Sequence, residues 1–135
     1  MPIEFPYSSK RTPDFGLILT PYVWLEVKTA KGVYRSQRFL FDTGADFTSF
    51  PKSMSRVVGV ELSICPQKVM YTANNEPMIT FQAKVKVRFA GEEFDLPCVF
   101  TDRDDTPFLL GRVGFIEKFE MFLSAKYKRL SFEKK

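Results

Sequence analysis

The chain has 135 residues, 44% of them hydrophobic, and a formal net charge of +4. This length and composition suit one globular domain, so a functional site must lie within one small domain or between copies of it. The chain has no histidine, which excludes Ser-His-Asp and Cys-His catalysis and removes the commonest zinc ligand. We therefore expect neither a metal nor a cofactor, and a hydrolase built from this chain would work through carboxylates.

The basic residues are scattered, with one modest concentration near the C-terminus, at Lys126, Lys128, Arg129, Lys134 and Lys135. No basic helix or aromatic RNA-binding motif accompanies it, so we interpret it as solvated surface and expect no nucleic-acid partner. No apolar run reaches the ~18 residues of a membrane span. The N-terminus lacks the basic and apolar stretches of a signal peptide, which predicts a cytoplasmic protein, one that could be released from a larger precursor.

Fifteen phenylalanines and five tyrosines, many in alternating stretches, predict a mostly β domain. Residues 1–14, rich in Pro, Ser, Lys and Arg, are expected to form an N-terminal arm, and residues 15–135 the folded domain. Regular structure should therefore begin near Phe15. Trp24 and most of the phenylalanines are expected to pack in the core.

The later elements follow from apolar alternation and from turn residues. We expect, in chain order, strands at 22–27 and 33–41 joined by a turn, a strand at 47–50, a short helix after Pro51, strands at 69–72 and 78–89 around an exposed hairpin tip, a strand at 94–100, a polar loop at 101–106, a buried segment at 108–111, a short helix at 113–119, and a closing hairpin of 121–123 and 129–132.

The strongest motif is an apolar strand that ends in Asp-Thr-Gly. The strand residues Phe39–Phe41 lead directly into Asp42–Gly44, which Ala45 and a second acid, Asp46, follow. Much later in the chain stands Leu-Leu-Gly-Arg, at 109–112. The tripeptide alone could be an ordinary strand-end turn. Its combination with the apolar strand and the distant Leu-Leu-Gly-Arg instead indicates a catalytic loop.

In these motifs the chain resembles the retroviral-type, or retropepsin-like, aspartic proteases. In that family an Asp-Thr-Gly or Asp-Ser-Gly loop is crossed by a strand that ends in two apolar residues and a glycine, and the similarity here extends over roughly 22–132. The resemblance implies a single-domain retropepsin-like fold with one or two short helices, closed as a homodimer. It also implies an aspartic endopeptidase that binds a polypeptide in extended conformation.

The chemistry of this family requires two carboxylates. Held about 3 Å apart they cannot both ionise, so they share a proton and act as base and acid in one step. One takes a proton from a water between them while the other polarises the peptide carbonyl, and no covalent intermediate forms. Because the chain has a single Asp-Thr-Gly, the second Asp42 would come from a second copy across a twofold axis.

The resemblance also implies roles for the residues around Asp42. Thr43 would direct its hydroxyl across the dimer axis, and Gly44 would permit a tight turn and a close approach of the substrate backbone. Ala45 replaces the Ser or Thr of pepsin-like enzymes and cannot donate a hydrogen bond to the catalytic carboxylate. Asp46 and Arg112 would form a bidentate ion pair that braces the loop and the substrate edge, although they could instead be unrelated surface charges.

The hairpin of about 70–79 would be the flap that covers the substrate. Its tip contains asparagines where retroviral flaps are rich in glycine, and asparagine can adopt the left-handed conformation that such a tip needs. The flap residues expected to contact substrate are Tyr71, Thr72, Ala73, Asn74 and Asn75.

Two alternatives accompany this interpretation. The first is a catalytically idle retropepsin-like domain that serves dimerisation or peptide binding, which fold alone does not separate from a protease. The second is a calcium site in the acidic loop 102–105, which lacks the ligand spacing and terminal glutamate of an EF-hand and is better interpreted as solvated. Cys65 and Cys98 are expected to behave as small buried or half-buried hydrophobes.

Overall fold

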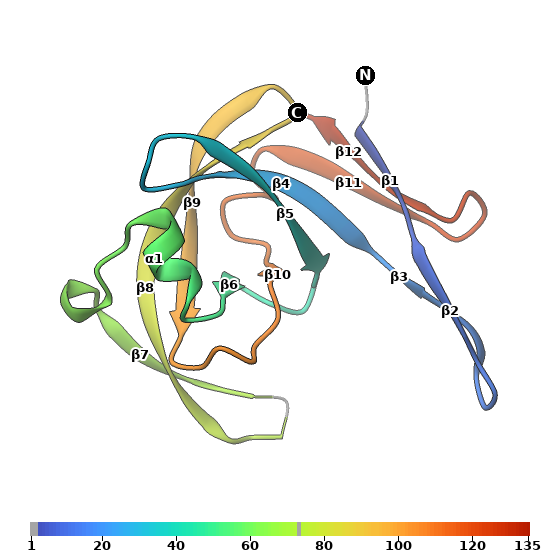
Figure 1. The fold of residues 1–135 in the computed structure, drawn as a ribbon. Coiled ribbons are helices and arrows are strands. Elements are labelled where there is room, and N and C mark those ends of the chain that lie inside the picture. The colour runs from blue at the N-terminus through green and yellow to red at the C-terminus, as the bar shows by residue number, and fades with distance from the viewer. Residues whose placement is uncertain (1–2, 73) are drawn as a thin grey trace.

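The computed structural model describes residues 3–72 and 74–135 and is mostly β (Figure 1). Its elements in chain order are β1 (Ile3–Pro6), β2 (Ser8–Thr12), β3 (Gly16–Thr20), β4 (Tyr22–Lys28), β5 (Tyr34–Phe41), β6 (Thr48–Phe50), α1 (Met54–Val58), the 3-10 helix η1 (Leu62–Ile64), β7 (Gln67–Tyr71), β8 (Pro77–Phe89), β9 (Glu92–Thr101), β10 (Leu109–Leu110), β11 (Phe119–Ser124) and β12 (Arg129–Lys134). The predicted mostly β domain is confirmed, whereas closure as a homodimer stays a prediction.

The strands form three sheets. The largest has seven strands in the order β4-β5-β10-β6-β9-β8-β7, and β4 also pairs with β8, so this sheet curls back on itself. A second sheet has the order β1-β12-β11, and β2 and β3 pair only as a two-stranded hairpin among the described strands. Among the described residues no helix is long and apolar enough to cross a membrane.

Strand alternation decides which side chains of β4 enter the core. Val23, Leu25 and Val27 are fully or almost fully buried, whereas Trp24 between them is 52% exposed. Successive side chains of a strand point to opposite faces, so a tryptophan between two buried residues must point outward. The expectation that Trp24 packs in the core is therefore wrong.

Phenylalanines fill the core, as the sequence predicts. The rings of Phe39 and Phe50 meet edge-on with centroids 5.5 Å apart. Phe41, which directly precedes Asp42, meets Phe132 edge-on at 5.7 Å, and this contact joins the large sheet to the three-stranded sheet. Edge-to-face aromatic pairs contribute about 0.5–1.5 kcal/mol beyond the burial of their area, so these contacts help to fix the strand that ends at Asp42.

Regular structure begins earlier than the composition suggests. The sequence predicts its start near Phe15, yet β1 already pairs antiparallel with β12, with Phe5 opposite Leu130. Phe5 stacks on Phe89 at a centroid distance of 6.0 Å, because the alternation of β1 directs it toward the core. The division into an arm at 1–14 and a domain at 15–135 stays a prediction.

The helix expected at 113–119 is not formed as a regular helix. The segment instead consists of turns, closed by backbone hydrogen bonds from Ile116 to Arg112 (2.9 Å) and from Phe119 to Phe115 (3.1 Å). Gly114 has a φ of +86°, a left-handed conformation that interrupts an α-helix. Phe115 and Phe119 remain buried, so the turns still present their apolar side chains to the core.

Candidate active site

The position of Asp42 is set by the strand β10, which lies between β5 and β6. The short strand β10 lies between two strands, parallel to β5 with Leu110 opposite Phe41, and antiparallel to β6 with Leu109 opposite Ser49. The backbone N–H of Asp42 donates to the carbonyl of Leu110 at 3.0 Å. The two sequence motifs therefore meet in space, and Asp42 begins the loop at the point where β10 crosses.

The loop at 42–46, which the sequence predicts to be the catalytic loop, is a tight turn that orients the carboxylate of Asp42. The N–H of Gly44 donates to Oδ1 of Asp42 at 2.9 Å, and the N–H of Ala45 donates to the backbone carbonyl of Asp42 at 3.2 Å. A Cβ at position 44 would lie 3.3 Å from the same Oδ1, which is tighter than an ordinary contact. Asp42 is half-buried, whereas Thr43 and Gly44 are exposed.

Gly111 makes the close crossing possible. An ideal Cβ on this residue would lie 2.4 Å from the carbonyl carbon of Phe47, which is far inside van der Waals contact. The N–H of Gly111 donates to the hydroxyl of Thr48 at 3.1 Å, and Thr48 is fully buried. We did not predict Thr48 as a site residue. A polar residue at the first position of a buried strand was the available signal.

Asp46 and Arg112 meet, but in a different geometry from the one expected. Nη2 of Arg112 donates to Oδ1 of Asp46, while Nη1 donates to the backbone carbonyl of Thr43 at 3.2 Å. The bidentate pairing implied by the resemblance is therefore wrong, because the guanidinium divides its donors between a carboxylate and a carbonyl. The side chain of Arg112 is 42% exposed and that of Asp46 is 65% exposed, so this is a surface ion pair in the single chain.

Backbone hydrogen bonds strengthen the same junction. The N–H of Arg112 donates to the carbonyl of Ala45 at 3.1 Å, and the N–H of Val113 donates to that of Asp46 at 2.9 Å. The loop after Asp42 is thus held along its length by the segment that follows β10. Whether Asp46 and Arg112 also contact substrate stays a prediction.

A cavity of about 640 Å³ opens beside the catalytic loop. Asp42, Ala45 and Asp46 line one side of it, and Tyr71 and Thr72 of the predicted flap line another. The rest of the lining combines polar side chains with the apolar side chains of Met70, Met78, Val99 and Leu109. A cavity that offers both carboxylates and apolar surface suits a polypeptide with apolar side chains.

The predicted hairpin at 70–79 is present. Strands β7 and β8 pair antiparallel up to Tyr71 opposite Pro77. Thr72 closes the tip, because its N–H donates to the carbonyl of Glu76 at 2.9 Å and its hydroxyl accepts from the N–H of Glu76 at 3.2 Å. Tyr71 and Thr72 of this hairpin line the same cavity as Asp42.

Asparagine supplies the left-handed residue of this tip, as the sequence predicts. Asn75 has a φ of +62°, and its N–H donates to the carbonyl of Thr72 at 2.8 Å. Asn74 and Asn75 are exposed, and their contact with substrate stays a prediction. Ala73, which we also predicted as a flap residue, lies outside the described residues.

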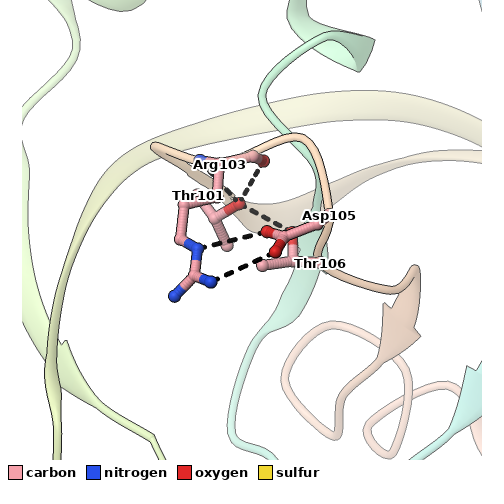
Figure 2. A network of polar contacts seen from close by, with 4 residues as sticks. All are labelled: Thr101, Arg103, Asp105 and Thr106. Carbon is pink, nitrogen blue, oxygen red and sulfur yellow. Dashed lines mark hydrogen bonds and ion pairs between the residues drawn. The ribbon is translucent and has the colours of Figure 1, made fainter.

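The loop 101–106 carries four residues of the cavity wall that sequence reasoning missed, Thr101, Arg103, Asp105 and Thr106. Nε and Nη2 of Arg103 donate to the two carboxylate oxygens of Asp105, each at 3.1 Å, as Figure 2 shows. The hydroxyl of Thr101 donates to the carbonyl of Arg103 at 3.0 Å and lies 2.7 Å from the hydroxyl of Thr106. Arg103 and Asp105 line the cavity, which the position of this loop just before Leu109 could have signalled.

The ion pair of Arg103 and Asp105 is exposed, and it changes the pKa of the Asp105 carboxyl. Hydrogen bonding to the guanidinium of Arg103, with its charge as a second cause, lowers the pKa of Asp105 below its usual value. The carboxyl of Asp105 therefore ionises at a lower pH than a free aspartate does. The loop that we interpreted as merely solvated is indeed exposed, but it also forms a rim of the site.

Comparisons with protein-family models, curated sequences and solved structures show which proteins this chain resembles. The sequence model of the aspartyl protease family matches residues 26–112, a span that includes Asp42 and Arg112. A retropepsin-like aspartic protease from Rickettsia conorii is similar in structure, with a TM-score of 0.65 and 18% identity over 98% of this chain and 91% of the other. No curated protein sequence matches the chain.

A second solved structure is similar over less of the chain. It is EIAV protease in complex with the inhibitor HBY-793, with a TM-score of 0.52 and 16% identity over 69% of this chain and 82% of the other. At these sequence identities the two structures show that the chain shares their fold, and nothing more.

Proposed function

The chain belongs to the aspartyl protease family and has a retropepsin-like fold, and on this premise we propose that it is a homodimeric aspartic endopeptidase. Asp42 from each of two copies forms the catalytic pair. The observation that carries the proposal is the position of the Asp42 carboxylate. It is oriented by the N–H of Gly44 and borders a cavity that Tyr71 and Thr72 of the hairpin also line.

The second carboxylate of the pair has to come from another copy. Two further carboxylates line the same cavity, those of Asp46 and Asp105. Each is engaged by an arginine of its own chain, Arg112 for Asp46 and Arg103 for Asp105, and the hydrogen bonds from Arg103 lower the pKa of Asp105. The exposed loop around Thr43 and Gly44 is instead free to meet its own symmetry mate.

The location of Thr43 supports this arrangement. Thr43 is exposed and is not among the described residues that line the cavity. Its side chain is therefore available outside the substrate site, where the loop of a second copy would lie. In the proposed dimer the Thr43 hydroxyl bridges the two loops, and the Arg112 donor on the Thr43 carbonyl holds that residue in position.

The reaction needs only protons and water. The ionised carboxyl of the pair takes a proton from the water between the two side chains, and the water oxygen bonds to the peptide carbonyl carbon. The protonated carboxyl gives its proton to the carbonyl oxygen, which produces a tetrahedral diol. One carboxyl then gives its proton to the amide nitrogen while the other takes the proton of a diol hydroxyl. The carbon–nitrogen bond breaks, an acid and an amine leave, and the pair again holds one proton.

The substrate is a polypeptide in extended conformation. An added strand can satisfy its backbone groups on the flap and on the catalytic loop, and its alternate side chains then enter pockets. Met70, Met78 and Val99 supply the apolar wall for those side chains. We expect cleavage between apolar residues.

A peptide-library digest analysed by mass spectrometry tests the proposal, with Asp42→Asn as the matched control. Asparagine preserves the size of the side chain but cannot exchange the catalytic proton. We expect the wild-type chain to cleave and the Asp42→Asn chain to leave every peptide intact. If the wild-type chain binds a hydroxyl-bearing peptide inhibitor yet cleaves nothing, the domain is a binding module, and the proposal is wrong.

A further inference from the structure

A second concave surface borders the cavity that contains Asp42. It is a groove of about 520 Å³, and it shares Phe47 and Val99 with that cavity. These two residues and Pro97 give the groove an apolar lining, to which Gln82 and Lys84 add polar groups. We call it the distal groove. Because the two concave surfaces share residues, a polypeptide that leaves the cavity on this side reaches the distal groove next.

One face of the β8–β9 ladder carries both concave surfaces, and the two strands run side by side (Figure 1). Thr80 lies opposite Thr101 in the cavity, and Lys84 lies opposite Pro97 in the groove. Alternate residues of a strand point to the same face, so both pairs lie on one face. Lys84 follows Thr80 by four residues, or about 13 Å at ~3.3 Å per residue. An extended substrate would cover that length with about four residues.

Phe47 separates the cavity from the distal groove. It is half-buried and lines both of them. It directly follows Asp46, so the loop that begins at Asp42 continues into this side chain. Its backbone is held close to Gly111, where an added Cβ would lie 2.4 Å from the Phe47 carbonyl carbon. The boundary between the two concave surfaces is therefore fixed relative to Asp42.

The distal groove also carries positive charge that the chain does not neutralise. Lys68 lies opposite Thr80 in the β7–β8 register, and its ammonium is 5.9 Å from the centre of the Phe47 ring. Among the described residues neither Lys68 nor Lys84 belongs to an ion pair. The next acid on this face of β9, Asp95, is instead engaged by Lys86 at 3.3 Å. Apolar surface beside such ammonium groups suits an apolar side chain with an acidic neighbour.

We propose that the distal groove binds the substrate polypeptide about four residues from the scissile bond and selects an apolar side chain there with an acidic neighbour. This inference rests on the proposed function, because it concerns the substrate of that endopeptidase. Gln82 and Val99 contact the apolar side chain, and Lys84 attracts the acidic one. In the twofold-symmetric dimer each copy supplies one groove, so both ends of the peptide are bound in the same way.

Two peptides that differ in one charge test the role of Lys84. Both derive from a sequence that the wild-type chain cleaves, and at about the fifth residue before the scissile bond one has glutamate and the other lysine. We expect the wild-type chain to cleave the glutamate peptide with a kcat/KM about threefold higher, the usual effect of one exposed charge pair. The Lys84→Glu chain should prefer the lysine peptide by about the same factor. Lys31→Glu is the matched control, because it makes the same change in net charge in the turn between β4 and β5, and it should keep the wild-type preference.

A second variant tests the apolar contact. Gln82 is exposed and lies opposite Val99, so Gln82→Trp fills the groove without disturbing the core. The wild-type chain should cleave a peptide with leucine at about the fourth residue before the scissile bond roughly tenfold better in kcat/KM than a peptide with glycine there. In the Gln82→Trp chain this ratio should fall close to one. Thermal melts verify that each variant folds.

The outcomes separate this inference from the proposed function. A wild-type chain that cleaves all of these peptides with the same kcat/KM overturns the distal groove and leaves the protease intact. The inference is equally overturned if Lys84→Glu keeps the wild-type preference and weakens the dimer in analytical ultracentrifugation, because the groove then contacts the second copy. A wild-type chain that cleaves no peptide at all overturns both proposals.

Discussion

Gly111 follows β10 and lies against the backbone of Phe47 and Thr48. Its replacement by alanine should lower the free energy of unfolding and displace the strand that holds Asp42. The added Cβ would lie 2.4 Å from the carbonyl carbon of Phe47 and 2.6 Å from its oxygen. Both are backbone atoms, so no side-chain rotation can relieve the overlap. Restoring an ordinary carbon–carbon separation requires a shift of about 1 Å, which pulls β10 away from Asp42.

The magnitude follows from two contributions. Overpacking of this kind costs about 1–3 kcal/mol. The shift also strains the buried hydrogen bond of 3.1 Å from the Gly111 N–H to the Thr48 hydroxyl, and a buried polar group left without its partner costs about 1–3 kcal/mol. We expect a loss of about 3 kcal/mol in the free energy of unfolding, and a fall in Tm on the order of 10 °C for a domain of this size.

Thermal melts followed by circular dichroism measure the effect, with Gly91→Ala as the control. Gly91 has a φ of +75° and nothing within 4 Å of an added Cβ, so its substitution costs only the strain of a left-handed alanine, about 1 kcal/mol. Gly111 has no such φ, so its cost comes from contact alone. A Gly111→Ala loss no larger than that of Gly91→Ala would refute the reasoning.

Three further predictions concern the charges and thiols. A double-mutant cycle of Asp46→Ala and Arg112→Ala in the isolated chain should give a coupling of about 0.5 kcal/mol, because both side chains are more than 40% exposed; a coupling of several kilocalories would show a buried pair. Ala45→Ser should shift the acid limb of the rate profile down by about half a pH unit, since the new hydroxyl can donate to the ionised form of the catalytic pair, and an upward shift would contradict this. Burial raises the pKa of Cys98 to about 12, so at neutral pH its thiol stays protonated, and a thiol reagent should modify Cys65 in the folded protein and Cys98 only on unfolding.

The sequence predicts well the two motifs that meet in the structure, because local patterns encode each of them. The apolar strand before Asp42 and the later Leu-Leu-Gly-Arg are each recognisable on their own, and the structure joins them through the Asp42 to Leu110 hydrogen bond. The flap tip is equally local, since Asn75 supplies the left-handed residue. Such features depend on turn chemistry and on strand alternation, which a short window of sequence contains.

Features that depend on distant contacts are harder to predict. The place of Arg103 and Asp105 in the cavity wall follows from the path of the chain into β10, and its one signal in the sequence is the position of the loop just before Leu109. Composition misled at the N-terminus, where Phe5 and its neighbours look like an arm yet pair with β12. Trp24 is a different error, because the alternation of Val23 and Leu25 already required it to face outward.

The central claim is that two copies of Asp42 share one site, and mixing chains tests it most directly. Wild-type protein at a concentration where it is fully dimeric is equilibrated with a roughly tenfold excess of Asp42→Asn chains, and peptide cleavage is measured per wild-type chain. If the pair spans two copies, almost every wild-type chain becomes trapped in a mixed dimer, and activity falls by roughly tenfold. Unchanged activity per wild-type chain, with mixed dimers verified by mass spectrometry, would contradict the account.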